Sequence, residues 1–254
     1  MNVRALLRPV AIGAFRVVDR LRHSRHRYVL ILSHMRSGSS LLLHILLTNP
    51  GITGQGERNR AYTRPGDLAV FAIKANLAHR DRLFRASLSV DQVNHTHFLP
   101  NEELLLDPHV LPVILFREPR AAIGSMMQTF NRFREFRLEE GIGHYRERVT
   151  TLTRYANMLF NARDTLALTY DQLVEQSEQS FANLQAYLRL EEPLSGNYAS
   201  YDFTGRRGDP SDRIRAGKIL PGRNDHGVDI DAQTLAEMQA IYRECLAACG
   251  IAES

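Results

Sequence analysis

Residues 28–42 join an apolar strand, a short polar turn and an apolar helix without interruption. The strand reads YVLIL, the turn from residue 33 reads SHMRSGS, and the helix continues as SLLLHILL. In such a junction the backbone N–H groups of the turn and the positive end of the helix dipole converge on a phosphate-sized oxyanion. Arg36 adds a full positive charge. This segment predicts an α/β fold built around an anion-binding turn.

The turn differs from the phosphate loop G-x-x-x-x-G-K-[ST]. Gly38 and Ser40 fall on that pattern, whereas Ser33 and Ser39 replace its first glycine and its lysine. The missing lysine argues against an enzyme that handles a γ-phosphate with magnesium. A serine-rich turn that merely starts a helix is the alternative interpretation.

Residues 111–127 repeat the order of strand, polar junction and helix. Pro119 suits an early helical position, because its φ is preset and no needed N–H is lost. Arg117 closes the strand, and Ser125 follows it by eight residues, two turns into the helix.

The two segments together resemble sulfotransferases that use 3′-phosphoadenylyl sulfate (PAPS), nearest in motif to bacterial carbohydrate and tyrosylprotein sulfotransferases. The resemblance covers roughly residues 28–220. It implies that Arg117 and Ser125 hold the 3′-phosphate of the donor. It also implies that the 5′-phosphosulfate group is bound by Arg36, Ser37, Gly38, Ser39 and Ser40.

Two later segments extend this resemblance. Residues 168–173, LTYDQL, are similar to the Y-E-D-L junction of the family, whose tyrosine approaches the nucleotide, here Tyr170. Residues 208–219, GDPSDRIRAGKI, resemble the late basic loop that places a lysine near the 3′-phosphate. We expect Lys218 in that role first and Arg215 second, although the R-K-G triplet of the cytosolic members is absent.

Sulfonate transfer needs a base for the acceptor proton and cations that absorb charge on the leaving group. The resemblance offers two bases, Glu57 after the GQG turn and His97 in HTHFLP, of which Glu57 ranks first. A histidine has a suitable unperturbed pKa. Lys74 is a further candidate cation for the bridging oxygen. No metal is expected.

Length and composition agree with one α/β domain, with a parallel central sheet flanked by helices. The chain has 254 residues and 44% hydrophobic content, enough for a full core. Its net charge of +4 is modest, so a nucleic-acid partner is not expected. Two cysteines, Cys245 and Cys249, give no disulfide framework and predict a reduced, cytoplasmic protein.

Residues 1–27 alternate apolar and arginine residues and predict a basic amphipathic helix that precedes a sulfotransferase domain at 28–254. Its longest uncharged run is far short of the ~20 residues that span a bilayer. Packing on the domain and peripheral contact with anionic lipid at the inner face of a membrane both stay open.

Apolar patterning predicts further strands at 70–73, 93–98, 111–116 and 165–170. Helices are expected near 80–86, from Asn101, and over 138–162, 172–189 and 230–249, with Asp171 capping the fourth. The Gly- and Pro-rich stretch 195–229 is long enough to carry binding residues.

These features predict transfer of a sulfonate from PAPS to a hydroxyl of a carbohydrate or glycolipid acceptor. A kinase-like nucleotide phosphotransferase is the alternative enzyme, because similar anion-binding turns serve both reactions. A catalytically silent nucleotide-binding protein is the third hypothesis.

Overall fold

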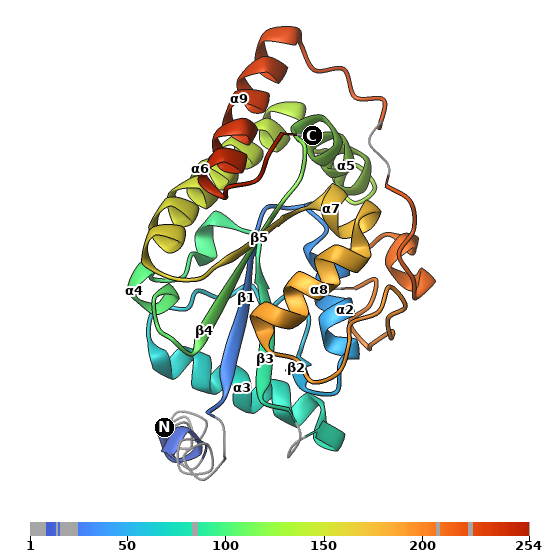
Figure 1. Cartoon of the computed structure of the whole chain (residues 1–254). Coiled ribbons are helices and arrows are strands. Elements are labelled where there is room, and N and C mark those ends of the chain that lie inside the picture. The colour runs from blue at the N-terminus through green and yellow to red at the C-terminus, as the bar shows by residue number, and fades with distance from the viewer. Residues whose placement is uncertain are drawn as a thin grey trace, which may run out of the picture.

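The computed structural model describes residues 9–13, 15, 25–82, 86–206, 209–222 and 226–253. Its centre is a parallel sheet in the order β2-β3-β1-β4-β5 (Figure 1). The strands are β1 (Arg27–Ser33), β2 (Ile52–Gly54), β3 (Leu88–Val93), β4 (Val110–Phe116) and β5 (Leu166–Thr169). Every neighbouring pair is parallel, which confirms the predicted single α/β domain.

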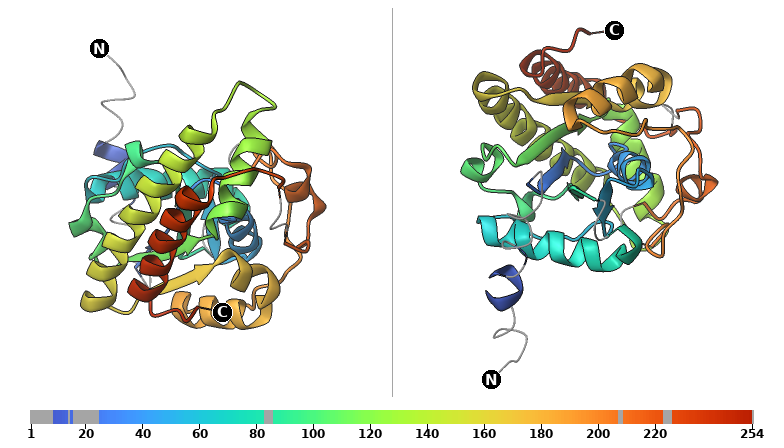
Figure 2. Two further views of the ribbon diagram at one scale, coloured as in Figure 1. Left: turned by 90° about the horizontal axis from the view of Figure 1, so that it is seen from above. Right: turned by 60° about the horizontal axis from the view of Figure 1, so that its bottom comes forward.

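Helices cover both faces of the sheet (Figures 1 and 2). Successive side chains of β1 point to opposite faces, so Leu30 and Leu32 join one apolar core and Val29 and Ile31 the other. The first core is closed by α3 (Pro65–Ala78), α4 (Glu102–Leu105), α5 (Pro119–Phe130), α6 (Leu138–Ala162) and α9 (Ala232–Ala248). The second is closed by α2 (Ser39–Thr48), α7 (Tyr170–Glu175) and α8 (Ser177–Leu188).

Two predicted strands are wrong. Residues 70–73 lie inside α3, where Phe71 and Ala72 are fully buried, because four apolar residues fit a buried helix as well as a strand. Residues 93–98 include only the last residue of β3; Thr96–Phe98 form a 3₁₀ turn. The true strand, LSVDQV, was hidden by the polar residues Asp91 and Gln92 in a fully buried element.

Two expected helices and one capping residue also differ from prediction. The expected helix at 80–86 is a 3₁₀ turn over Arg80–Arg82, and residues 83–85 lie outside the described part. The helix expected at 172–189 is two helices that meet at Gln176. Thr169, not Asp171, caps the first of them by accepting from the backbone N–H of Gln172 at 3.1 Å. The helix α6 has the predicted bounds.

The sheet order brings the two anion-binding segments together. β1 lies between β3 and β4, and Ser33 at the end of β1 is in register with Leu115. The turns that leave the carboxyl ends of β1 and β4 therefore emerge side by side. In open α/β sheets, ligands bind at this edge, where the strand order reverses.

The N-terminal prediction is only partly covered by the structure. Residues 9–13 are helical, whereas residues 1–8, 14 and 16–24 lie outside the described residues. Within the described part of the chain, no helix is long and apolar enough to cross a membrane.

Candidate active site

The turn after β1 closes through two residues with positive φ. Arg36 has φ 63° and Gly38 has φ 92°, and Gly38 directly precedes α2. A Cβ on Gly38 would lie 2.7 Å from a ring carbon of Tyr170. Glycine is therefore required both by the backbone conformation and by the close approach of that ring.

A cavity of about 490 Å³ opens over this turn. It draws residues from the ends of β1, β3 and β4, from the start of α7 and from the segment 209–222. Of the predicted site residues, it is lined by Arg36, Gly38, Ser39, Ser40, Glu57, Arg117, Ser125, Tyr170 and Lys218. Residues separated by more than 180 positions in the sequence thus share one cavity.

Arg36 links three segments of the cavity. Its Nε donates to Ser125 Oγ at 3.0 Å, and its Nη1 lies 2.7 Å from Asp209 Oδ1. Burial acts to raise the pKa of Asp209, but the charge and hydrogen bond of Arg36 and the hydrogen bonds from Ser211 together hold that pKa below its ordinary value. Asp209 is therefore an ionised partner of Arg36 at neutral pH.

Arg117 is buried and faces the same cavity. Its guanidinium carbon lies 3.9 Å from the centre of the Tyr170 ring, a cation–π contact. Its backbone is fixed on both sides: the N–H donates to His34 Nε2 at 3.0 Å, and the carbonyl accepts from the Tyr145 hydroxyl at 2.8 Å. Burial lowers the pKa of Arg117 from its ordinary value, because the charged guanidinium is partly removed from water. An anionic partner therefore stabilises this cation more than it would an exposed one.

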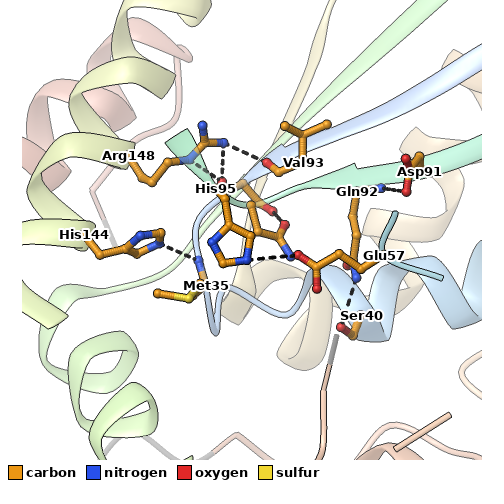
Figure 3. A network of polar contacts seen from close by, with 11 residues as sticks. Met35, Ser40, Glu57, Asp91, Gln92, Val93, His95, His144 and Arg148 are labelled. Carbon is orange, nitrogen blue, oxygen red and sulfur yellow. Dashed lines mark hydrogen bonds and ion pairs between the residues drawn. The ribbon is translucent and has the colours of Figure 1, made fainter. Parts of the chain in front are cut away.

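Glu57 is held by the residues that follow β3 (Figure 3). Its Oε1 accepts from Asn94 Nδ2 at 3.2 Å and lies 3.4 Å from His95 Nε2. Asn94 in turn accepts a short hydrogen bond from the Ser33 hydroxyl. The Glu57 side chain is 10% exposed, so this carboxylate sits at the wall of the cavity in a fixed orientation.

Three further side chains brace the end of the sheet, and Figure 3 shows two of them, Arg148 and His144. Arg148 of α6 donates to the Ser33 carbonyl at 2.9 Å and to the Val93 carbonyl at 2.7 Å, tying β1 to β3. His144 accepts from the Met35 N–H at 3.1 Å. His34 bonds the Met35 carbonyl at 2.8 Å. Burial lowers the pKa of both histidines to about 3, so both are neutral.

Four predicted site residues do not line this cavity. Ser37 is fully buried beneath the turn. Lys74 does not end a strand; it is an exposed residue of α3. His97 is exposed in the 3₁₀ turn. Arg215 is exposed and packs on Gly205, where a Cβ would lie 2.5 Å from its Nε.

Sequence reasoning missed Asn94, His95 and Asp209. Asn94 and His95 directly follow β3, and an assignment of β3 to residues 88–93 would have placed them at the ligand-binding edge. Asp209 stands in the predicted basic loop, where only cations were sought. Among the described residues, no three His, Cys, Asp or Glu side chains gather as a metal site.

Comparison with solved structures identifies the fold of this chain. No family model and no curated protein matches the sequence. A sulfotransferase domain from the curacin biosynthetic pathway aligns with a TM-score of 0.57 and 14% identity, over 90% of this chain and 99% of that one. A sulfotransferase domain from the Synechococcus PCC 7002 olefin synthase gives 0.58 and 15%, over 86% and 94%. The chain has the sulfotransferase fold.

Proposed function

We propose that the protein transfers a sulfonate group from PAPS to an acceptor hydroxyl. The observation that carries this proposal is the single cavity that gathers both anion-binding turns and a fixed carboxylate. Two separate cationic positions, Arg36 and Arg117, suit a nucleotide with phosphates at both ends of its ribose. The sulfotransferase fold supports the same assignment.

In this proposal the turn around Gly38 and the start of α2 bind the 5′-phosphosulfate. Arg117 and Ser125 bind the 3′-phosphate, and Lys218 adds a charge from the segment 209–222. The Tyr170 ring, held between Gly38 and Arg117, contacts the nucleotide between its two phosphates. Arg215 is not part of this assignment, because it is exposed outside the cavity.

The reaction follows from these positions. The acceptor oxygen attacks sulfur, its proton passes to the Glu57 carboxylate, and the bond from sulfur to the bridging oxygen breaks. The 5′-phosphate that leaves keeps the electron pair and is stabilised by Arg36 and the amides of the turn. Glu57 is preferred over His97 because Glu57 lines the cavity and His97 does not. A carbohydrate or glycolipid is the proposed acceptor.

Nucleotide binding tests the donor assignment. 3′-Phosphoadenosine 5′-phosphate (PAP) should raise the melting temperature much more than AMP, because only PAP carries the 3′-phosphate. At a hundredfold excess over Kd, the gain in unfolding free energy is about 2.7 kcal/mol. Arg117→Ala should remove most of the difference between the two nucleotides. Equal shifts with PAP and AMP on the unmodified protein would refute this assignment.

A further inference from the structure

A second hollow, of about 520 Å³, opens beside Glu57 and α3. We refer to it as the cationic pocket. Glu57 lines both this pocket and the donor cavity, so the two meet at the proposed base. The pocket is lined by Gln55, Glu57, Arg58, Asn59, Arg60, Lys74 and Arg206.

Cationic side chains outnumber carboxylates in the lining of this pocket. Its lining carries four cationic side chains and one carboxylate. Arg58 is partly engaged, since it lies 5.1 Å from the Phe71 ring centre and acts to lower the pKa of Asp91, which burial raises to about 7. Within the described part of the chain, no carboxylate lies within ion-pair distance of Arg60 or Arg206. Clustered like charges repel each other unless an anion joins them.

Packed contacts hold the three segments of this pocket together. Gln55 donates from Nε2 to the Lys74 carbonyl at 2.7 Å, which ties the chain after β2 to α3. The Phe203 ring packs on Gly56, where a Cβ would lie 2.9 Å from it. Thr204 hydrogen-bonds His44 of α2 at 2.8 Å. The backbone that carries Arg206 is therefore attached to the turn that carries Glu57.

We propose that the acceptor carries an oxyanion, a phosphate, sulfate or carboxylate, close to the hydroxyl that is sulfonated. This inference rests on the proposed function, because the hydroxyl must face Glu57. Arg60 and Arg206 bind the oxyanion and thereby fix the distance of the hydroxyl from the base. Guanidinium groups bind such oxyanions through paired charge-assisted hydrogen bonds. The acceptor class is thus an anionic hydroxyl compound, such as a sugar phosphate.

Calorimetric titration of the PAP-saturated protein tests this proposal with two matched pairs of probes. The pairs are glucose 6-phosphate against glucose, and phenyl phosphate against phenol. PAP fills the donor cavity, so added phosphate has to bind elsewhere. The phosphorylated member of at least one pair should bind about tenfold or more tightly than its neutral partner, the effect of one hydrogen bond to a charged group. The preference should weaken as salt rises.

The double variant Arg60→Ala/Arg206→Ala should abolish this preference and leave the PAP thermal shift unchanged. Arg243→Ala, an exposed arginine of α9, is the matched control for lost charge and should keep the preference. Equal binding of both members of each pair, no binding of either phosphate, or a preference that survives the double variant would overturn the inference. If PAP does not raise the melting temperature of the unmodified protein but the phosphate preference is observed, the proposed donor is wrong and the inference about the acceptor is retained. In that case the titration is read on the nucleotide-free protein.

Discussion

At the scale of single residues, orientation distinguishes the two candidate bases. Glu57 is held by Asn94 and His95 at the wall of the donor cavity, whereas His97 lies exposed outside it. His95, two residues before His97, is the histidine that lines the cavity beside Glu57. A hydrogen-bonded carboxylate with one free oxygen can accept a proton without reorienting.

Glu57→Gln tests the base directly. This variant keeps size and hydrogen-bonding shape but removes the basic oxygen, so we expect turnover to fall by about 10²–10⁴. PAP affinity should stay near normal, which excludes a collapsed site. His97→Asn should cost far less. A nearly inactive His97→Asn beside an unaffected Glu57→Gln would assign the proton to the histidine instead.

The buried neutral histidines predict a loss of stability in acid. Burial lowers the pKa of His34 and His144 to about 3, so the unfolded chain binds more protons below the ordinary histidine pKa of 6.5. Each histidine therefore removes up to about 1.4 kcal/mol per pH unit as the pH falls below about 6.5. Asp91 acts in the opposite direction over this range, because burial raises its pKa to about 7. Burial also lowers the pKa of His44 and His79, so the histidines together outweigh Asp91 and stability falls in acid.

Urea denaturation between pH 5 and pH 6.5 measures this effect. His144→Gln keeps an acceptor for the Met35 N–H but cannot be protonated. Its free energy of unfolding should fall less steeply with falling pH than that of the unmodified protein, by up to about 1.4 kcal/mol per pH unit, because one group that binds a proton only on unfolding has been removed. An unchanged pH slope in this variant would show that His144 is not the responsible group.

At the scale of elements, the segment 209–222 closes one side of the cavity. It also carries a carboxylate that competes with the donor phosphate for Arg36. Asp209 pairs with Arg36, the side chain proposed to bind the 5′-phosphosulfate. A donor phosphate has to displace this carboxylate or share the guanidinium with it. Two anions at one cation repel each other, which lowers donor affinity.

Asp209→Asn should therefore bind PAP more tightly, by about tenfold, since one hydrogen bond to a charged group is no longer broken. Asp212→Asn is the matched control, because Asp212 lines the same cavity and has no ion pair among the described residues. Fluorescence or calorimetric titration measures both. Weaker binding in Asp209→Asn would mean that Asp209 positions Arg36 for the donor.

Elements with strong local signals could be predicted from the sequence. The turn after β1 and the junction at Pro119 combine apolar runs, glycine or proline and a cation, and both junctions were predicted at these positions. β3 could not be predicted, because it contains polar Asp91 and Gln92, whose side-chain partners come from distant segments: the Tyr62 hydroxyl bonds Asp91, and Gln92 donates to Ser40. Lys74 was misplaced for a different reason: an apolar run at 70–73 does not distinguish a strand from a helix.

At the scale of the whole molecule, topology assembles the site. β3 and β4 follow each other in sequence but lie on opposite sides of β1, so residues after all three strands meet at one edge. Arg148 reinforces that edge by joining the carbonyls of β1 and β3 from α6. Separate segments of the chain supply the cationic side chains that line the cavity, which are Arg36, Arg117, Arg132, Arg213 and Lys218.

This distribution of charge predicts transfer without a divalent metal. In a phosphate-loop kinase, a loop lysine and magnesium together neutralise the transferred group. Here Ser39 stands at the lysine position, and the arginines and loop amides are arranged around the cavity instead. Protein treated with EDTA should retain full transfer from PAPS, and ATP with magnesium should stabilise it less than PAP does. Strict dependence on magnesium, with ATP the better ligand, would favour the phosphotransferase hypothesis, because a γ-phosphate would then be the group that moves.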